Sequence, residues 1–321
     1  MKWTNSVASR IRMRDLQILH AVATSRGIGK AAAELAISQP AISKAISDLE
    51  AEFGVPLFDR TPSGVQVTPY GSVLLESARA IFDSLRLGVT AIDALADPTA
   101  GLVRIGTTPP LAAGFVPAVI GELATRYRRF EHVVVQADLG VLHGHLRERK
   151  IDFAIAPSTG VSPQEDMDLE PLFDDWHVPA AGKHSKWVRR RNIAWADVIE
   201  EPWVLPPTDI ALWPYLAQAF EEHGLTMPRA TVATVSIPAH FRLLATGKFL
   251  TMLPISVLAY AGTDSAVRGL RLQSPVKPRP VFIITLKNRT LSPSVRTFID
   301  FARSSAAKSA KLQGQKVDED H

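Results

Sequence analysis

The chain has 321 residues, which is enough for about two domains at roughly 150 residues each. Its composition, 46% hydrophobic and 21% charged, is that of an ordinary soluble globular protein. The formal net charge of +4 is carried by the first fourteen residues, where Lys2, Arg10, Arg12 and Arg14 stand without any acidic residue. The remaining residues are neutral in sum. This segment is therefore either a solvated terminus or an arm that contacts phosphates.

The absence of cysteine excludes a disulfide framework, a thiolate metal site, a cysteine nucleophile and a thiol redox sensor. The first fourteen residues are basic but have no apolar core, so they do not resemble a signal peptide. The most apolar later stretch, residues 249–261, is short and contains Pro254, so we predict no membrane span. These features together predict a cytoplasmic protein.

Apolar residues at helical spacing predict three helices in the first part of the chain, over residues 13–26, 30–36 and 39–53. Gly27 and Gly29 are expected to interrupt the helical pattern between the first two helices. For the third helix, Ser38 is a plausible N-cap, with Pro40 in the first turn and Gly54 at the end.

A turn over residues 59–64 is predicted between two short extended segments. Thr68 and Pro69 then form the start signal of a long helix that should run to Asp97, because Pro98 prevents its continuation. Apolar residues repeat along this helix with alternating spacings of four and three, interrupted by a glycine at one core position. The seam consists of Leu74, Ala78, Ile81, Leu85, Gly88, Ile92 and Leu95. A single helix with one apolar seam needs a covering partner, and we expect a second copy of the chain.

From Gly101 onward, strand patterns alternate with helical ones, which favours βαβ units and a parallel sheet. The predicted strands cover residues 102–106, 133–137, 151–156, 203–205, 231–235, 249–253 and 280–286. The predicted helices cover residues 111–129, 142–150, 212–223, 239–246 and 294–308.

The short second helix, the tight turn and the capped third helix together describe a helix-turn-helix. In this motif the N-terminal residues of the last helix meet base edges in the major groove. The pattern alone is common to many three-helix units. The following hairpin-like segment and the cationic N-terminus add weight, because Arg60 and the arm could contact phosphates.

Several runs, with matching spacing over nearly sixty positions, resemble the N-terminal signature of LysR-type transcriptional regulators. These runs are LQILHAVA (residues 16–23), KAAAEL (30–35), SQPAIS (38–43), FGVPLFDR (53–60) and VTPYG (67–71). Later segments resemble parts of the family's effector-binding domain. They are LVRIG (residues 102–106), LRERKIDFAI (146–155) and the glycine-to-LLP segment over residues 243–254.

The resemblance implies an α+β multi-domain protein with four parts. These are a winged helix-turn-helix (residues 13–68), a linker and dimerisation helix (69–98), a two-lobed α/β domain of the periplasmic-binding-protein type (101–308) and a flexible tail (309–321). The chain would cross between the lobes near residues 171–178 and again near 274–280. Lobe I would then hold residues 101–172 and 278–308, and lobe II residues 173–277.

The implied function is that of a sequence-specific transcriptional regulator controlled by a small-molecule effector bound between the lobes. The implied partners are double-stranded promoter DNA, the effector and further copies of the chain as a dimer or tetramer, with RNA polymerase as a further candidate. No cofactor, metal or enzymatic activity is implied.

Carried onto this sequence, the family's motif predicts that the start of the third helix approaches base edges, with Gln39 able to bind adenine through two hydrogen bonds. The predicted DNA-binding residues are Arg14, Lys30, Ser38, Gln39, Pro40, Ser43, Lys44 and Arg60. For Ser38 a role as helix cap competes with DNA contact. Gly27-Ile28-Gly29-Lys30 replaces the family's usual Gly-Ser-Phe-Thr, which removes a hydroxyl cap and an aromatic core residue.

The predicted effector-binding residues follow strands, at helix starts in both lobes. They are Thr107, Thr108, Pro109, Pro110, Val141, Pro206, Thr208 and Ser236. Many family members carry a hydroxyl at the positions of Pro110 and Val141, where it anchors an effector carboxylate. Apolar residues there argue against an aromatic acid and leave sugars or other polar metabolites open. The Thr107-Thr108 pair and residues 286–293 are similar to a branch that includes sugar-responsive regulators.

Other interpretations carry less support. A two-lobed domain also fits a solute-binding protein, but the preceding helix-turn-helix argues against it. An enzyme fused to a DNA-binding module would need converging titratable groups, and the sequence offers no obvious set. His143 and His145 lie two residues apart, so on a helix they point in different directions and cannot share a metal. The basic cluster around Trp187 fits a solvated face, a DNA-facing surface or a contact between subunits.

Overall fold

The computed structural model describes residues 10–61, 64–97, 99–157, 165–190, 192–210, 212–260, 266–271 and 277–318. The chain forms two compact units, Met1–Val89 and Thr90–His321. Within the described part of the chain, no helix is both long and apolar enough to cross a membrane.

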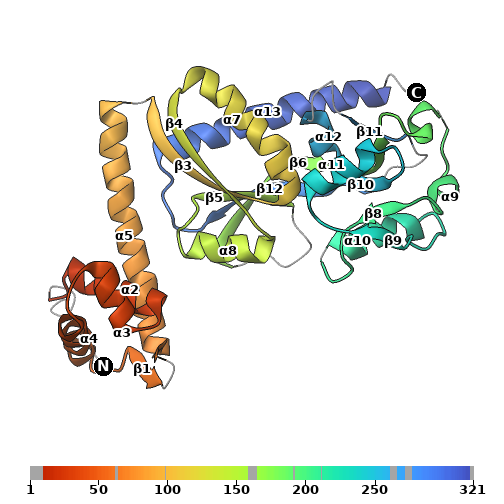
Figure 1. The fold of residues 1–321 in the computed structure, drawn as a ribbon. Helices are drawn as coiled ribbons and strands as arrows, with labels where there is room; N and C mark the ends of the chain where they lie inside the picture. The colour runs from red at the N-terminus through yellow and green to blue at the C-terminus, as the bar shows by residue number, and fades with distance from the viewer. Residues whose placement is uncertain are drawn as a thin grey trace. The chain divides into compact units, whose positions relative to one another are not determined.

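The first unit begins with the helices α2 (Met13–Ser25), α3 (Ile28–Leu35) and α4 (Gln39–Phe53). An antiparallel hairpin of β1 (Phe58–Thr61) and β2 (Gly64–Val67) follows, as Figure 1 shows. One apolar core joins all three helices to the hairpin. Its buried side chains include Leu19, Val22, Ile42, Ile46, Leu49 and Leu57. The structure therefore confirms the winged helix-turn-helix.

The caps predicted for the third helix are confirmed. The Ser38 hydroxyl accepts a hydrogen bond from the Ala41 N–H at 3.4 Å, and Pro40 lies in the first turn. Gly54 ends the helix in the left-handed region at φ 67°, which glycine adopts without steric cost. Capping is therefore the role that the structure gives to the Ser38 hydroxyl.

The second helix differs from its prediction at its start. It begins at Ile28, with Gly27 as its N-cap, so that Gly29 lies inside the first turn rather than in a break. Ile28 is partly buried and packs against the core of the unit. The wing strands are also longer than predicted, because Asp59, Arg60 and Thr61 pair with β2 instead of forming part of the turn.

The long helix α5 (Pro69–Ala96) agrees with the prediction. The Thr68 hydroxyl accepts a hydrogen bond from the Gly71 N–H at 3.0 Å and so caps the first turn. The boundary between the two compact units falls within this helix. Pro98, which was expected to stop the helix, lies outside the described residues.

Lobe I of the second unit contains a five-stranded mixed sheet in the order β4-β3-β5-β12-β6. Its strands are β3 (Ala100–Thr107), β4 (Arg129–Gln136), β5 (Phe153–Pro157), β6 (Met167–Asp175) and β12 (Arg279–Leu286). Strands β4 and β5 run parallel to β3, as predicted, whereas β12 is antiparallel to both of its neighbours. The helices of this lobe are α6 (Pro109–Ala113), α7 (Phe115–Arg126), α8 (Leu139–Arg147) and α13 (Pro293–Asp318).

The single helix predicted over residues 111–129 is divided into α6 and α7 at Gly114. A Cβ atom at Gly114 would lie 2.6 Å from the Ser256 carbonyl oxygen, so the close approach of another backbone requires glycine here. At the other end of the chain, α13 continues to Asp318, although a flexible tail was predicted from residue 309. The alanine, lysine and glutamine residues of that stretch have good helix propensity.

Lobe II contains a second five-stranded sheet in the order β11-β7-β10-β8-β9. Its strands are β7 (His177–Gly182), β8 (Trp203–Leu205), β9 (Ala230–Ala233), β10 (Leu250–Pro254) and β11 (Val267–Gly269). Its helices are η1 (Lys186–Arg189), α9 (Trp195–Val198), α10 (Leu212–Glu221), α11 (Ile237–Ala245) and α12 (Ile255–Tyr260). Trp187, Trp195 and Trp203 are buried in its core, which explains three of the tryptophans of this region.

The chain crosses from lobe I to lobe II at Trp176, between β6 and β7. The structure moves the lobe boundary from residue 172 to residue 175, because β6 pairs with β12 as far as the Asp175–Arg279 pair. The return crossing lies between β11 and β12, and residues 272–276 of it lie outside the described part. The first crossing thus lies within the predicted range of residues 171–178.

Polar side chains lie buried at this crossing. The Asp175 carboxylate accepts hydrogen bonds from the Ser256 N–H at 3.1 Å and the Ser256 hydroxyl at 2.6 Å, while burial raises its pKa. Burial lowers the pKa of His177 to about 3. Arg279 stacks over the Tyr215 ring at 5.0 Å, and burial raises the pKa of Tyr215 to about 12. These contacts join lobe II to the two strands that carry the chain across.

Candidate nucleic-acid interface and effector-binding loops

The start of α4 presents polar side chains to solvent. Ser38, Gln39, Pro40 and Lys44 are exposed and Ser43 is half-buried, whereas the apolar stripe of the same helix is buried. A helix can meet base edges only where its side chains are free of the core, and this face satisfies that condition. The structure thus brings together five of the predicted DNA-binding residues.

Gln39 lies against the start of α3. A Cβ atom at Gly29 would stand 3.1 Å from Gln39 Nε2, so a side chain at residue 29 would press on the Gln39 amide. Lys30, the next residue of α3, is exposed. Sequence reasoning treated Gly29 as a helix breaker and as part of a replacement that removes an aromatic residue. It missed this contact, which depends on how α3 and α4 pack.

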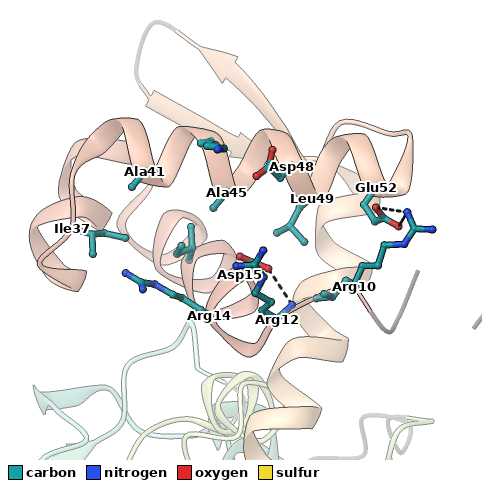
Figure 2. Close-up of a pocket in the computed structure, with 13 residues that line it drawn as sticks. Arg10, Arg12, Arg14, Asp15, Ile37, Ala41, Ala45, Asp48, Leu49 and Glu52 are labelled. Carbon is teal, nitrogen blue, oxygen red and sulfur yellow. Dashed lines mark hydrogen bonds and ion pairs between the residues drawn. The ribbon is translucent and has the colours of Figure 1, made fainter. Parts of the chain in front are cut away.

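A groove of about 460 Å³ lies between the beginning of α2 and the side of α4. Figure 2 shows the side chains of the arm, Arg10, Arg12 and Arg14, on one wall and α4 on the other. Lys44 adds a fourth cation from α4, and the acids of the groove are Asp15, Asp48 and Glu52.

Two of these acids have structural partners. Arg10 pairs with Glu52 at 3.4 Å, and Asp15 accepts a hydrogen bond from the Arg12 N–H at 3.1 Å. Among the described residues, the guanidinium groups of Arg12 and Arg14 and the Lys44 ammonium group form no ion pair. The basic arm predicted from the sequence therefore lies, from Arg10 onward, beside the helix that was predicted to read DNA.

Arg60 lies in β1 opposite Val65, and its side chain is outside the described part. The base of the wing is held by the Glu50 carboxylate of α4, which accepts hydrogen bonds from the Leu57 and Phe58 N–H groups at the start of β1. Sequence reasoning missed Glu50, because an isolated glutamate on a helix carries no signal of its partners.

The long helix α5 exposes an apolar stripe. Val73 is 68% exposed, Ile81 44%, Leu85 59% and Ile92 68%, and such values for large apolar side chains indicate an uncovered surface. Leu74, predicted as part of the seam, instead packs against the core of its own unit.

The loops predicted to bind the effector differ in how accessible they are. Thr107 is fully buried and its hydroxyl donates to the Ile155 carbonyl at 2.9 Å, so this side chain braces the sheet. Pro206 is also buried, directly after β8. These two residues were predicted to contact an effector, but their side chains are occupied in packing.

The other predicted effector-binding residues reach the surface at least in part. Thr108 precedes α6 and its hydroxyl makes no capping bond, while Pro109 and Pro110 beside it are half-buried. Val141 is 50% exposed at the start of α8. In lobe II, Thr208 and Ser236 are exposed, and the Ser236 hydroxyl caps α11 by accepting from the Ala239 N–H at 3.4 Å.

A buried histidine supports the loop that ends at Ser236. His240 contacts the Thr251 hydroxyl through Nδ1 at 2.8 Å and the Thr234 carbonyl through Nε2 at 3.1 Å. The Thr251 hydroxyl also donates to the Val204 carbonyl at 2.6 Å. Burial lowers the pKa of His240, which favours its neutral form. This network ties β8, β10 and the loop after β9 to α11.

Comparison with protein families covers both parts of this architecture. The family described as "Bacterial regulatory helix-turn-helix protein, lysR family" matches residues 13–72, and the "LysR substrate binding domain" matches residues 96–307. The chain belongs to the LysR family of transcriptional regulators. As a LysR-family protein, it is a DNA-binding regulator whose second unit is an effector-binding domain.

Curated relatives of the chain are regulators too. It is 27% identical over 256 residues to the HTH-type transcriptional regulator TdcA of Escherichia coli K12, covering 80% of this chain and 81% of that protein. It is 26% identical to the HTH-type transcriptional regulator GbpR of Azospirillum brasilense, covering 95% of this chain and 89% of that protein.

Solved structures of LysR-family proteins share the fold. A variant of full-length OxyR from Pseudomonas aeruginosa has a TM-score of 0.65 at 20% identity and covers 92% of this chain and 98% of its own. Full-length CbnR in complex with its target DNA has a TM-score of 0.54 at 20% identity. The match covers 92% of this chain and 100% of CbnR.

Proposed function

We propose that this LysR-family regulator reads its operator through the start of α4 and holds the DNA backbone through the arm beside it. The observation that carries this proposal is the arrangement around α4, where Gln39 is exposed at the helix start and Arg12, Arg14 and Lys44 line the adjoining groove. Gln39 supplies the paired donor and acceptor that adenine requires. The cations supply charge for phosphates.

Lys30 and Arg60 complete the proposed interface as phosphate contacts from α3 and from the wing. Ser43 and Pro40 meet base edges beside Gln39, and the Ser38 hydroxyl keeps its role as helix cap. Contact with both half-sites of an operator then requires two copies of the chain. The exposed stripe of α5 supports pairing through Ile81, Leu85 and Ile92 in a dimer, with a tetramer as the larger assembly.

The proposed effector is a polar small molecule, such as a sugar or an organic acid, bound between the two lobes. The hydroxyls of Thr108, Thr208 and Ser236 support this proposal because they stand at helix starts or in loops after strands. Pro110 and Val141 offer no hydroxyl for a carboxylate. The regulator acts in the cytoplasm, without enzymatic activity, and RNA polymerase is its proposed partner in transcription.

A mobility-shift assay with the DNA immediately upstream of the protein's own gene tests this function. We expect a specific complex that survives excess competitor DNA and whose affinity changes when the right metabolite is added, because a ligand shifts an equilibrium only through differential affinity. Candidate sugars and organic acids can first be ranked by the rise in melting temperature that they cause. No complex beyond that formed with unrelated DNA would count against the proposal.

Replacement of Gln39 separates base reading from general attraction to DNA. Gln39→Ala should remove most of the preference for the operator, about 1–3 kcal/mol for a lost bidentate contact, while leaving salt-dependent binding to unrelated DNA intact. Fluorescence anisotropy with operator and scrambled duplexes measures both affinities. An equal loss on both duplexes would exclude a base-reading role for this residue.

The arm is tested through the salt dependence of binding. If Arg12 and Arg14 each neutralise one phosphate, single alanine variants should reduce the slope of log K against log salt by about 0.9 each. Arg128, exposed on the second unit, provides a charge-matched control whose alanine variant should leave the slope unchanged. Unchanged slopes for both arm variants would identify the arm as a solvated terminus.

The stripe on α5 is tested by inserting a charge. Leu85→Lys should weaken self-association, because a lysine in a covered apolar stripe loses its hydration without gaining a partner. Glu76→Lys on the same helix is the control, since Glu76 is already exposed and polar. Sedimentation velocity across a concentration series measures the assembly. If both variants associate as the unmodified chain does, the interface lies elsewhere.

A further inference from the structure

The helix α4, which we propose as the recognition helix, holds the base of the wing through one carboxylate. Glu50 Oε1 accepts hydrogen bonds from the Leu57 N–H at 2.8 Å and from the Phe58 N–H at 3.2 Å. Leu57 is buried at 1% exposure, and Glu50 itself is half-buried. Without this carboxylate, two backbone donors next to the core would lack an acceptor, a costly arrangement.

The start of α5 holds the same stretch of backbone from another direction. The Thr68 N–H donates to the Leu57 carbonyl at 3.1 Å, and the Thr68 hydroxyl donates to the Pro56 carbonyl at 2.7 Å. A Cβ atom at Gly71 would lie 2.1 Å from the Leu57 carbonyl oxygen, so α5 approaches as closely as a glycine allows. Residues 56–58 are thus held between the recognition helix and the linker helix.

The second strand of the wing is anchored to the turn before α3. The Val65 N–H donates to the Arg26 carbonyl at 3.2 Å. At Gly64, where φ is 131°, a Cβ atom would lie 2.4 Å from the same oxygen. An isolated two-stranded hairpin is marginal in water, so a wing of two four-residue strands depends on such anchors for its position.

We infer that Glu50 is a positioning residue for DNA recognition, setting the place of the wing relative to the reading face of α4. This inference rests on the proposed function, because it assumes that α4 and the wing meet the same duplex. Glu50 touches no DNA in this account. It acts through the backbone of Leu57 and Phe58, which leads into β1, the first strand of the wing. Arg60 lies within this strand.

Three substitutions at residue 50 separate positioning from other roles. Glu50→Gln keeps an oxygen acceptor at the same reach, Glu50→Asp keeps the charge but withdraws the carboxylate by one methylene, and Glu50→Ala removes the acceptor. The control is Glu76→Ala, which removes an exposed carboxylate from α5. The probe is a duplex that the full-length unmodified chain enriches from a randomised DNA pool.

Hydroxyl-radical footprinting and binding isotherms on that duplex provide the readout. We expect Glu50→Ala and Glu50→Asp to bind about ten-fold more weakly and to lose protection at the flank reached by the wing, while keeping protection at the base pairs under α4. Glu50→Gln and Glu76→Ala should give the footprint of the unmodified chain. Circular dichroism and melting temperatures report whether each variant folds.

The outcomes are distinct. A full footprint for Glu50→Asp, or the loss of flank protection in Glu50→Gln, would overturn the positioning role. If Glu50→Ala does not fold, the comparison of the Gln and Asp variants decides by the same criteria. Failure of the unmodified chain to enrich any duplex would overturn the proposed function itself. That result is recognisable before any variant is made.

Discussion

The buried stripe of α4 is the constraint on which the DNA-binding unit depends. Ile42, Ile46 and Leu49 lie on one face of this helix, and their burial against α2 and α3 contributes about 1.5–3 kcal/mol for each side chain. Polar contacts at the surface contribute less. Burial of this face therefore fixes the rotation of the helix about its axis, and the polar side chains at its start have to face outward.

The two flanks of α4 follow from the same rotation. One flank faces the groove that the arm lines with arginines. The other carries Glu50, which reaches the base of the wing. A rotation of α4 by one residue, about 100°, would bury Ser43 or Ser47 and would withdraw the Glu50 carboxylate from the Leu57 N–H. The burial of one face of α4 thus sets the positions of its exposed polar face, of the cationic groove and of the base of the wing.

Much of this architecture is readable from local sequence. Ser38 and Pro40 at the start of α4 and Gly54 at its end mark the limits of this helix. Their effects depend on neighbours within a few residues, and the structure confirms each of them. The two lobes and the long helix are also recognisable, because their apolar periodicities are long and regular.

What the sequence could not show depends on contacts between distant segments. Gly114 divides a helix because the Ser256 backbone comes within touching distance, 142 residues later in the chain. The strand β6 extends to Asp175 because it pairs with β12, and no local sequence pattern predicts the register of that pairing. The periodicity of α5 cannot tell that Leu74 belongs to the core of its own unit. Likewise, a threonine after a strand, such as Thr107, looks available until its hydroxyl is found bonded to Ile155.

The two units of the chain are joined within one helix. The boundary lies within α5, so the units share a helix rather than a separate loop. The helix α5 is therefore a continuous covalent link between the two units, and its start packs into the core of the first unit. Between α5 and the reading helix stands the backbone of residues 56–58, held by Thr68 on one side and by Glu50 on the other. A shift of α5 that preserves those hydrogen bonds moves the wing and α4 together as one body. The hydrogen bonds to residues 56–58 thus couple the start of α5 to α4 and to the base of the wing.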